Sequence, residues 1–278
     1  MRIDLDKEHR SLWSRLGKGV RRWQGMGLAH LAPLVLILSI SSGANAQGPA
    51  PKHDLSGVWA LQPAHETSED DKQSPGGAIP PMTAWAKARY DLEKPGYGKR
   101  AAPGGNDPIL ECDPMGFPRI LYFPTPFEFA QISNRVLQMF ERDHVVREIW
   151  TDGRALPSDP DPLWYGYSVG KWVDDTTFVI ESTGYDDRTW LGAAGFPHSE
   201  TMRLEERYQR VDRDTINFTL KIDDPQAYTQ PWIALPRVLK LRPRAEIRQG
   251  YCVASEEQAF TKRIREPGAL NTGTVPKN

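Results

Sequence analysis

The sequence predicts an all-β protein: an antiparallel up-and-down barrel with one short helix before the second strand and another near the C-terminus. Apolar runs recur from residue 119 to residue 253, and turn residues such as Asp174-Asp175 separate them at hairpin intervals. Hairpins join neighbouring antiparallel strands, so this spacing indicates an antiparallel sheet that is closed or sandwiched. The 278 residues and 39% hydrophobic content are enough for one domain with a sizeable core.

Residues 1–46 have the pattern of a cleaved signal peptide. Basic residues including Arg21 and Arg22 precede the apolar run 31–40, which ends in the small-x-small pattern Ala44-Asn45-Ala46. The run is too short to span a bilayer, so we expect a periplasmic or secreted protein without stable membrane insertion after leader cleavage. Cleavage would remove seven of the 35 basic and three of the 36 acidic residues, which leaves a net charge of −5.

A single barrel domain is expected over residues 47–266, followed by a flexible tail at 267–278. The first strand includes Trp59, and residues 62–112 are a polar loop and helix insertion, a candidate lid, with a helix at 83–93 capped by Thr83. A capping box that begins at Ser255 opens the final helix. The other strands are predicted at 119–123, 126–132, 135–142, 145–151, 164–172, 176–183, 198–209, 215–222, 232–241 and 246–253.

The segment 198–209 carries the main candidate site. Read with the period of two of a strand, it places His198 and Glu200 on one face with Met202 and Leu204, while the opposite face is wholly polar. Burying two titratable groups beside apolar side chains is unfavourable unless they are paired or used. Three readings remain open: an acid/base or ligand-orienting pair, a structural hydrogen-bonded pair, and metal ligands. We expect no metal, because the mature chain offers few further histidines to complete a site.

Other residues are predicted to join this site at the mouth of the barrel. Asp187 and Arg188 lie in the turn before the segment, and Asp224 continues the inward parity of the strand 215–222. Each also has a plainer interpretation, as a surface ion pair or a turn cap. Small residues at 166, 168 and 170 would make room on the wall. The residues expected to bind a ligand are Arg154, Tyr165, Tyr167, Trp190, Asp224 and Trp232.

Composition and cysteine usage narrow the function classes. A mildly acidic exported domain is a poor candidate for nucleic acid, and the sequence has no glycine-rich phosphate loop, so we expect no nucleotide cofactor and no other cofactor. In an oxidising compartment the two cysteines, Cys112 and Cys252, are predicted to form one disulfide between an early loop and the last strand. The oligomeric state is not predicted.

Gly57-Val58-Trp59 at the start of the first strand, followed by many hairpin-linked strands, resembles the lipocalin-like barrels, where a G-x-W opens the barrel. A longer pattern is similar to a large group of exported bacterial proteins without an established activity, and this likeness covers nearly the whole mature chain. It includes Asp152-Gly153-Arg154, Trp164 to Trp172, Pro197-His198-Ser199-Glu200 and Ile222 to Trp232. The resemblance implies one exported β-barrel and supplies no reaction.

Two functions follow as hypotheses. A barrel of about eight strands is filled by side chains or holds one small ligand, and the long insertion favours an interior pocket for a small amphipathic or aromatic molecule. The alternative is a cofactor-independent lyase, isomerase or hydrolase. In that case His198 would be the general base, Glu200 would orient it, and Arg188 or Arg154 would stabilise negative charge.

Overall fold

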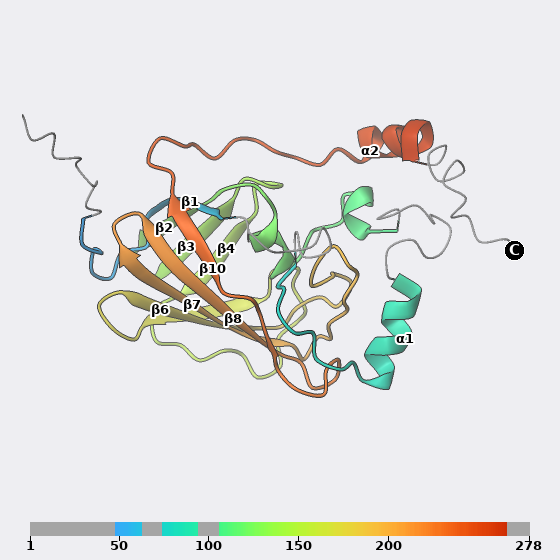
Figure 1. Ribbon diagram of the computed structural model, residues 1–278, viewed down its shortest axis with the longest axis horizontal. Coiled ribbons are helices and arrows are strands. Elements are labelled where there is room, and N and C mark those ends of the chain that lie inside the picture. Colours follow the sequence, from blue (N-terminus) through green and yellow to red (C-terminus); the bar gives the residue numbers. More distant parts are fainter. Residues whose placement is uncertain (1–47, 63–73, 94–105, 266–278) are drawn as a thin grey trace, which may run out of the picture. The chain divides into compact units, whose positions relative to one another are not determined.

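A computed structural model describes residues 48–62, 74–93 and 106–265, and within them the chain forms a closed barrel of nine strands (Figure 1). The barrel closes because β10 pairs with both β1 and β8, so the first and last strands of the barrel are joined. A short tenth strand, β9 (Trp232–Ile233), pairs with β8 alone. The strands of the barrel are β1 (Gly57–Leu61), β2 (Phe127–Ile132), β3 (Arg135–Phe140), β4 (Val146–Trp150), β5 (Tyr167–Trp172), β6 (Thr177–Thr183), β7 (Arg203–Asp212), β8 (Thr215–Asp223) and β10 (Arg237–Leu241).

One pairing departs from the predicted topology. β4 and β5 run parallel, through the residue pairs Ile149 with Ser168 and Trp150 with Val169, whereas the other pairings between the named strands are antiparallel. The expected antiparallel up-and-down order is therefore wrong at this point, and the turn at Asp152-Gly153 does not form a hairpin. Parallel strands need a long crossover. The connection 151–166 supplies it, and its three prolines keep it out of the sheet.

Most predicted strands are confirmed to within a few residues, but four segments differ. Residues 119–123 form a 3-10 helix, η4 (Arg119–Tyr122), and 246–253 contains no strand. The segment 232–241 is broken into β9 and β10 around Pro236, because proline cannot donate a hydrogen bond to the sheet. The 198–209 strand starts late, at Arg203.

The two predicted helices are present. α1 (Ala84–Glu93) begins after Thr83, whose hydroxyl accepts a hydrogen bond from the Ala86 amide at 3.3 Å, as expected of an N-cap. α2 (Ala254–Phe260) starts two residues earlier than its capping box predicted, with Val253 in place of Ser255 as N-cap and no side-chain cap. It continues into η5 (Thr261–Arg265).

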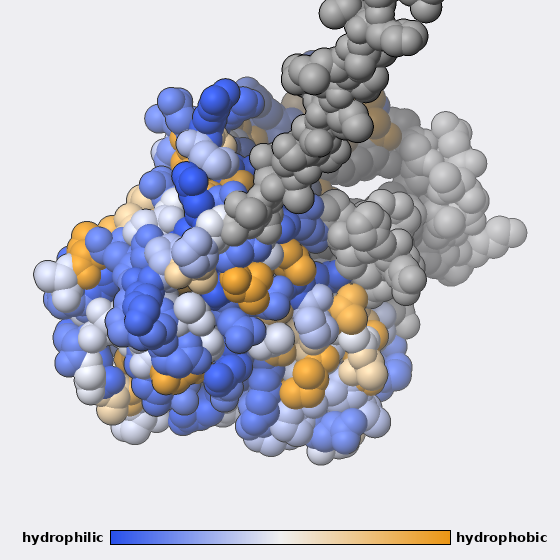
Figure 2. Space-filling model, turned by 60° about the vertical axis from the view of Figure 1, so that its left-hand side comes forward, coloured by the Kyte–Doolittle hydropathy of each residue, from blue (hydrophilic) through white to orange (hydrophobic). Residues whose placement is uncertain are grey.

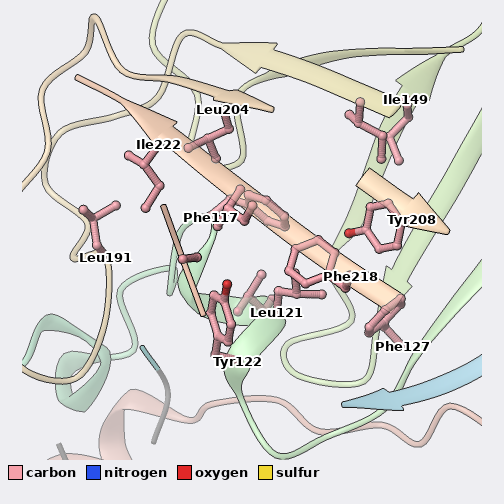
Figure 3. Close-up of a cluster of buried hydrophobic side chains, with 14 of the residues drawn as sticks. Phe117, Leu121, Tyr122, Phe127, Ile149, Leu191, Leu204, Tyr208, Phe218 and Ile222 are labelled. Carbon is pink, nitrogen blue, oxygen red and sulfur yellow. The ribbon is translucent and has the colours of Figure 1, made fainter. Parts of the chain in front are cut away.

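A segment just before β2 fills part of the barrel interior. Met115, Phe117 and Leu121, from the stretch that includes η4, are each about 1% exposed and belong to the main apolar cluster. Figure 3 shows Phe117, Leu121 and Tyr122 among strand residues such as Phe127 and Phe218. The segment therefore occupies part of the interior in which a ligand pocket was predicted. The packing segment follows the candidate lid 62–112 in the chain instead of lying within it.

The described part of the chain contains one disulfide. The disulfide between Cys112 and Cys252 is confirmed, with an S–S distance of 2.05 Å, although Cys252 lies in an extended segment rather than in a strand. On the face shown in Figure 2, apolar side chains form small separate patches within a polar surface. The predicted leader 1–46 and tail 267–278 lie outside the described residues.

Among the described residues, no helix is both long enough and apolar enough to cross a bilayer.

Candidate functional site

His198 and Glu200 do not face the same way. The strand predicted from residue 198 begins only at Arg203, and residues before it form a turn in which the Met202 amide donates to the Ser199 carbonyl. His198 is fully buried, whereas Glu200 is exposed. The predicted inward-facing pair is therefore wrong, because alternation between faces holds only in extended chain.

His198 has a partner on each ring nitrogen. Its Nδ1 lies 3.1 Å from the Ser199 carbonyl oxygen, and its Nε2 lies 2.7 Å from the Thr189 hydroxyl. A carbonyl oxygen only accepts, so Nδ1 carries the proton and Nε2 accepts from Thr189 in the neutral ring. Burial lowers the pKa of His198, against the opposing effect of the Ser199 carbonyl. The ring is thus a neutral, fully bonded part of the packing.

Asp224 is buried, and its bonds are those of a turn cap. One carboxylate oxygen accepts from the Ser199 amide at 2.6 Å, and the other accepts from the Ser199 hydroxyl at 2.7 Å and the Ala227 amide at 3.2 Å. The carboxylate therefore ties the turn after His198 to the loop after β8. This bond also explains why β7 starts late, since the amide of Ser199 is used here instead of in the sheet.

Asp187 and Arg188 diverge although they are adjacent. Asp187 accepts from the guanidinium of Arg89 in α1 at 2.8 Å. Arg188 is exposed, is held by Asp186 through two hydrogen bonds to its Nε and Nη2, and lies over the ring of Trp164 with its guanidinium carbon 4.2 Å from the ring centre. Only Arg188 therefore reaches the neighbourhood of the cavity described below.

Trp190 and Trp232 are buried at 3% and 0% exposure. The indole N–H of Trp232 donates to the Gly76 carbonyl at 2.9 Å, and the ring packs edge-on against Phe196 and Tyr228. Arg119 lies beside Trp190, with its guanidinium carbon 5.9 Å from the ring centre. Both indoles support the packing at one end of the barrel, and neither lines the cavity.

The cavity lies along β4, β5 and the connection between them. Its volume is about 730 Å³. Three of the predicted ligand-binding residues, Arg154, Tyr165 and Tyr167, line it. The parallel strands β4 and β5 pair with each other through only two residue pairs. The cavity lies beside the residues that precede these pairs, where β4 and β5 do not pair with each other. The pocket therefore opens at the side of the barrel. Its full lining is Val146, Arg147, Glu148, Trp150, Arg154, Ala155, Leu156, Pro157, Leu163, Trp164, Tyr165, Gly166, Tyr167, Ser168 and Val169.

Arginine and tryptophan form the frame of this cavity. The Arg154 guanidinium carbon lies 3.6 Å from the centre of the Trp150 ring, and Asp152 holds Arg154 through paired hydrogen bonds. Arg188 covers Trp164 in the same manner. Such contacts hold the indole rings in one orientation, because the cation and the face of the ring attract one another.

The cavity extends to two buried residues, Arg147 and Ser168, that belong to a polar network inside the barrel. Arg147 of β4 donates to both carboxylate oxygens of Glu206 in β7, at 3.0 and 2.6 Å. It also donates to Ser168 at 3.0 Å. The small side chain of Ser168 thus provides room for the guanidinium. At Gly170, by contrast, the side chains of Phe178 and Ile149 occupy the space expected to be free.

Further donors and acceptors complete this network. Arg147 contacts Gln138 and Ser182, and the Tyr208 hydroxyl donates to Glu206 at 2.9 Å. Burial lowers the pKa of Arg147, but Glu206, Tyr185 and Tyr208 together raise it by more, so the net pKa is raised and the guanidinium stays charged. The ion pair is therefore fully compensated within the protein.

Sequence reasoning missed Arg147 and Glu206, although both leave a signal. Glu206 lies two residues after Leu204 and therefore on the same core face of β7. Arg147 lies two residues before the buried Ile149 and therefore on the same face of β4. Opposite charges on the core faces of two strands indicate a buried ion pair. Among the described residues, no group of three or more His, Cys, Asp or Glu side chains is placed to hold a metal.

No protein-family model, curated protein or solved structure matched this chain. The closed barrel is compatible with the lipocalin-like resemblance, and the site must be interpreted from its own geometry.

Proposed function

We propose that this domain binds one small aromatic or amphipathic molecule in the cavity beside β4 and β5. The observation that carries the proposal is the cavity itself, whose volume of about 730 Å³ falls within the range of roughly 300–1,000 Å³ typical of small-molecule sites. Its aromatic side chains offer flat apolar surface, and its arginines offer donors that orient a ligand.

The arginines of the lining favour a ligand with an electron-rich polar group to which they can donate, although each is already paired with a carboxylate, Arg147 with Glu206 and Arg154 with Asp152. Arg147 and Arg154 line the cavity together with one acid, Glu148, which is already paired with Arg135 at 2.8 Å. Arg188 adds a further cation near the Trp164 ring. A planar ring would lie against the indole and phenol rings while its polar group faces the exposed guanidinium of Arg154.

A periplasmic or secreted location belongs to the same proposal. The leader pattern at 1–46 supports it, and so does the disulfide between Cys112 and Cys252, since disulfides persist in oxidising compartments. An extracytoplasmic binding protein meets small amphipathic molecules directly.

The enzyme hypothesis has no comparable support. His198 does not line the cavity, both of its ring nitrogens are engaged, and Glu200 points to solvent. A general base must reach the proton that it removes. A binding role for the aromatic cavity is therefore the better hypothesis.

The test is ligand capture by purified, oxidised protein. Mass spectrometry of small molecules released from the protein would identify the ligand, and titration with the aromatic anion 1-anilinonaphthalene-8-sulfonate would measure the cavity directly by fluorescence. We expect Trp164→Ala to weaken binding of this probe about tenfold, which corresponds to 1.4 kcal/mol. The matched control is Tyr251→Ala, which removes an exposed aromatic residue elsewhere. Equal binding by wild type and Trp164→Ala would contradict the proposal.

A further inference from the structure

Arg237 is a buried cation on the inner face of the barrel. It is the first residue of β10, where it pairs with Phe218 of β8, and it shares its parity with Leu239. Phe218 and Leu239 are both fully buried, and Arg237 itself is 6% exposed. The guanidinium therefore lies in the core and not on the outer surface.

The guanidinium of Arg237 differs from those of the other buried arginines. Its Nε and Nη1 are buried and have no hydrogen-bond partner, and among the described residues no carboxylate lies within 4.0 Å of it. Arg119 has Asp107 and Arg147 has Glu206 as partners in the same core. An unpaired buried charge is strongly unfavourable, so the core around Arg237 is incomplete without a compensating group.

A second unsatisfied donor belongs to the aromatic ring that lies beside this cation. The hydroxyl of Tyr122 in η4 is buried without a hydrogen-bond partner, and the Arg237 guanidinium carbon lies 5.8 Å from the centre of the Tyr122 ring. Figure 3 shows the Tyr122 hydroxyl directed toward the interior of the apolar cluster. Burial raises the pKa of Tyr122, so its hydroxyl remains protonated and available as a donor.

The main chain at Gly76 passes next to the guanidinium of Arg237. A Cβ added at Gly76 would lie 3.3 Å from Nη2 of Arg237, so glycine is the residue that leaves this approach free. Gly76 also has a φ of +66°, a conformation that residues with side chains rarely adopt. The main chain at Gly76 therefore lies close to Nη2, the one guanidinium nitrogen that is not among the buried unpaired atoms.

We propose that Arg237 and Tyr122 form a site for a small oxyanion, separate from the cavity beside β4 and β5. A carboxylate or phosphate group would accept charge-assisted hydrogen bonds from the guanidinium and one from the phenol. It would supply the negative charge that the fold does not provide among the described residues. The same chemistry is available from a free inorganic anion and from the acidic head group of a larger molecule.

The experiment measures anion-linked stability of the oxidised protein at constant ionic strength in chloride buffer. Sodium phosphate and sodium acetate are titrated separately, and Tm is followed by circular dichroism. We expect a saturable rise in Tm of about 5 °C or more when one anion reaches a hundred times its Kd. Stabilisation by phosphate alone indicates a free inorganic anion, and stabilisation by acetate, with tighter binding of octanoate, indicates a carboxylate head group.

Two variants and two controls assign the effect to the site. Arg237→Met should abolish the saturable rise, while its Tm without added anion equals or exceeds that of wild type because the uncompensated charge is gone. Tyr122→Phe should weaken the apparent Kd about tenfold without lowering the Tm of the anion-free protein. Arg203→Met, at an exposed position of β7, and Trp164→Ala, in the cavity, should respond to phosphate and to acetate as wild type does.

Two results would overturn the proposed oxyanion site. The oxyanion site does not exist if wild type shows no saturable response to either anion, or if the response persists in Arg237→Met. A variant Arg237→Met that fails to fold would leave the decision with Tyr122→Phe, where an unchanged Kd would reject the site. Because the Trp164→Ala variant is scored separately, failure here leaves the proposed ligand cavity standing.

Discussion

Neutralising Glu206 should destabilise the barrel strongly, because this carboxylate compensates the buried Arg147. The substitution Glu206→Gln keeps the size of the side chain and removes its charge. In the folded protein Glu206 accepts hydrogen bonds of 3.0 and 2.6 Å from Arg147 and one of 2.9 Å from Tyr208. Its side chain is 0% exposed and that of Arg147 is 1% exposed, so water cannot replace the lost partner.

The magnitude follows from the cost of an uncompensated charge in the core. Removing one partner of a buried ion pair typically costs about 3–5 kcal/mol of unfolding free energy. For a domain of this size each kcal/mol lowers Tm by about 2–4 °C, so a fall of roughly 6–20 °C is expected. The double variant Arg147→Met with Glu206→Leu should recover most of this loss, because neither charge is then left alone.

Urea unfolding followed by tryptophan fluorescence at pH 7, with the disulfide intact, measures these differences. The matched control is Glu205→Gln on the neighbouring exposed position, whose contact with Arg207 spans 3.5 Å at the surface and should contribute less than about 1 kcal/mol. A loss below about 1 kcal/mol in Glu206→Gln would refute the reasoning. So would a double variant less stable than Glu206→Gln.

Three further predictions concern stability. Burial lowers the folded-state pKa of His198, so its neutral form contributes stability that is present above pH 6.5 and is lost as pH falls through the folded pKa. Urea unfolding from pH 7 to pH 4 should show this loss. The pH dependence should be weaker in His198→Gln. Replacing both Cys112 and Cys252 by Ser opens a link across a sequence separation of 140 and should cost about 2–5 kcal/mol, measured against oxidised wild type; no loss would contradict a stabilising disulfide. Gly166→Ala places a Cβ 2.7 Å from Tyr185 at a φ of +63°, so Tm should fall, whereas Gly153→Ala, with the same backbone sign but open space, should cost less.

The predictions from sequence succeeded where the signal was local. The alternation of apolar and polar residues along 215–222 predicted β8 and its buried face, which includes Phe218, because successive side chains of a strand point to opposite faces of the sheet. Thr83 marked the start of α1 because its hydroxyl bonds the amide three residues later. The disulfide followed from there being only two cysteines.

The candidate site was predicted less well, because its geometry depends on distant residues. Asp224 binds the Ser199 amide across 25 residues of sequence, and that bond replaces the strand that would have aligned His198 with Glu200. No local pattern contains this information. Arg154, Tyr165 and Tyr167 line one pocket beside β4 and β5, and their role in ligand binding stays a prediction.

Sequence alone determined most of the segments that become strands and which of their faces are apolar, since burial pattern and turn residues act over a few positions. Tertiary structure alone decided that β4 and β5 run parallel, that the 115–122 segment fills the barrel, and that Arg147 meets Glu206. Those outcomes depend on contacts between residues far apart in the chain, where the energy of packing and of charge compensation is realised only once the barrel has closed.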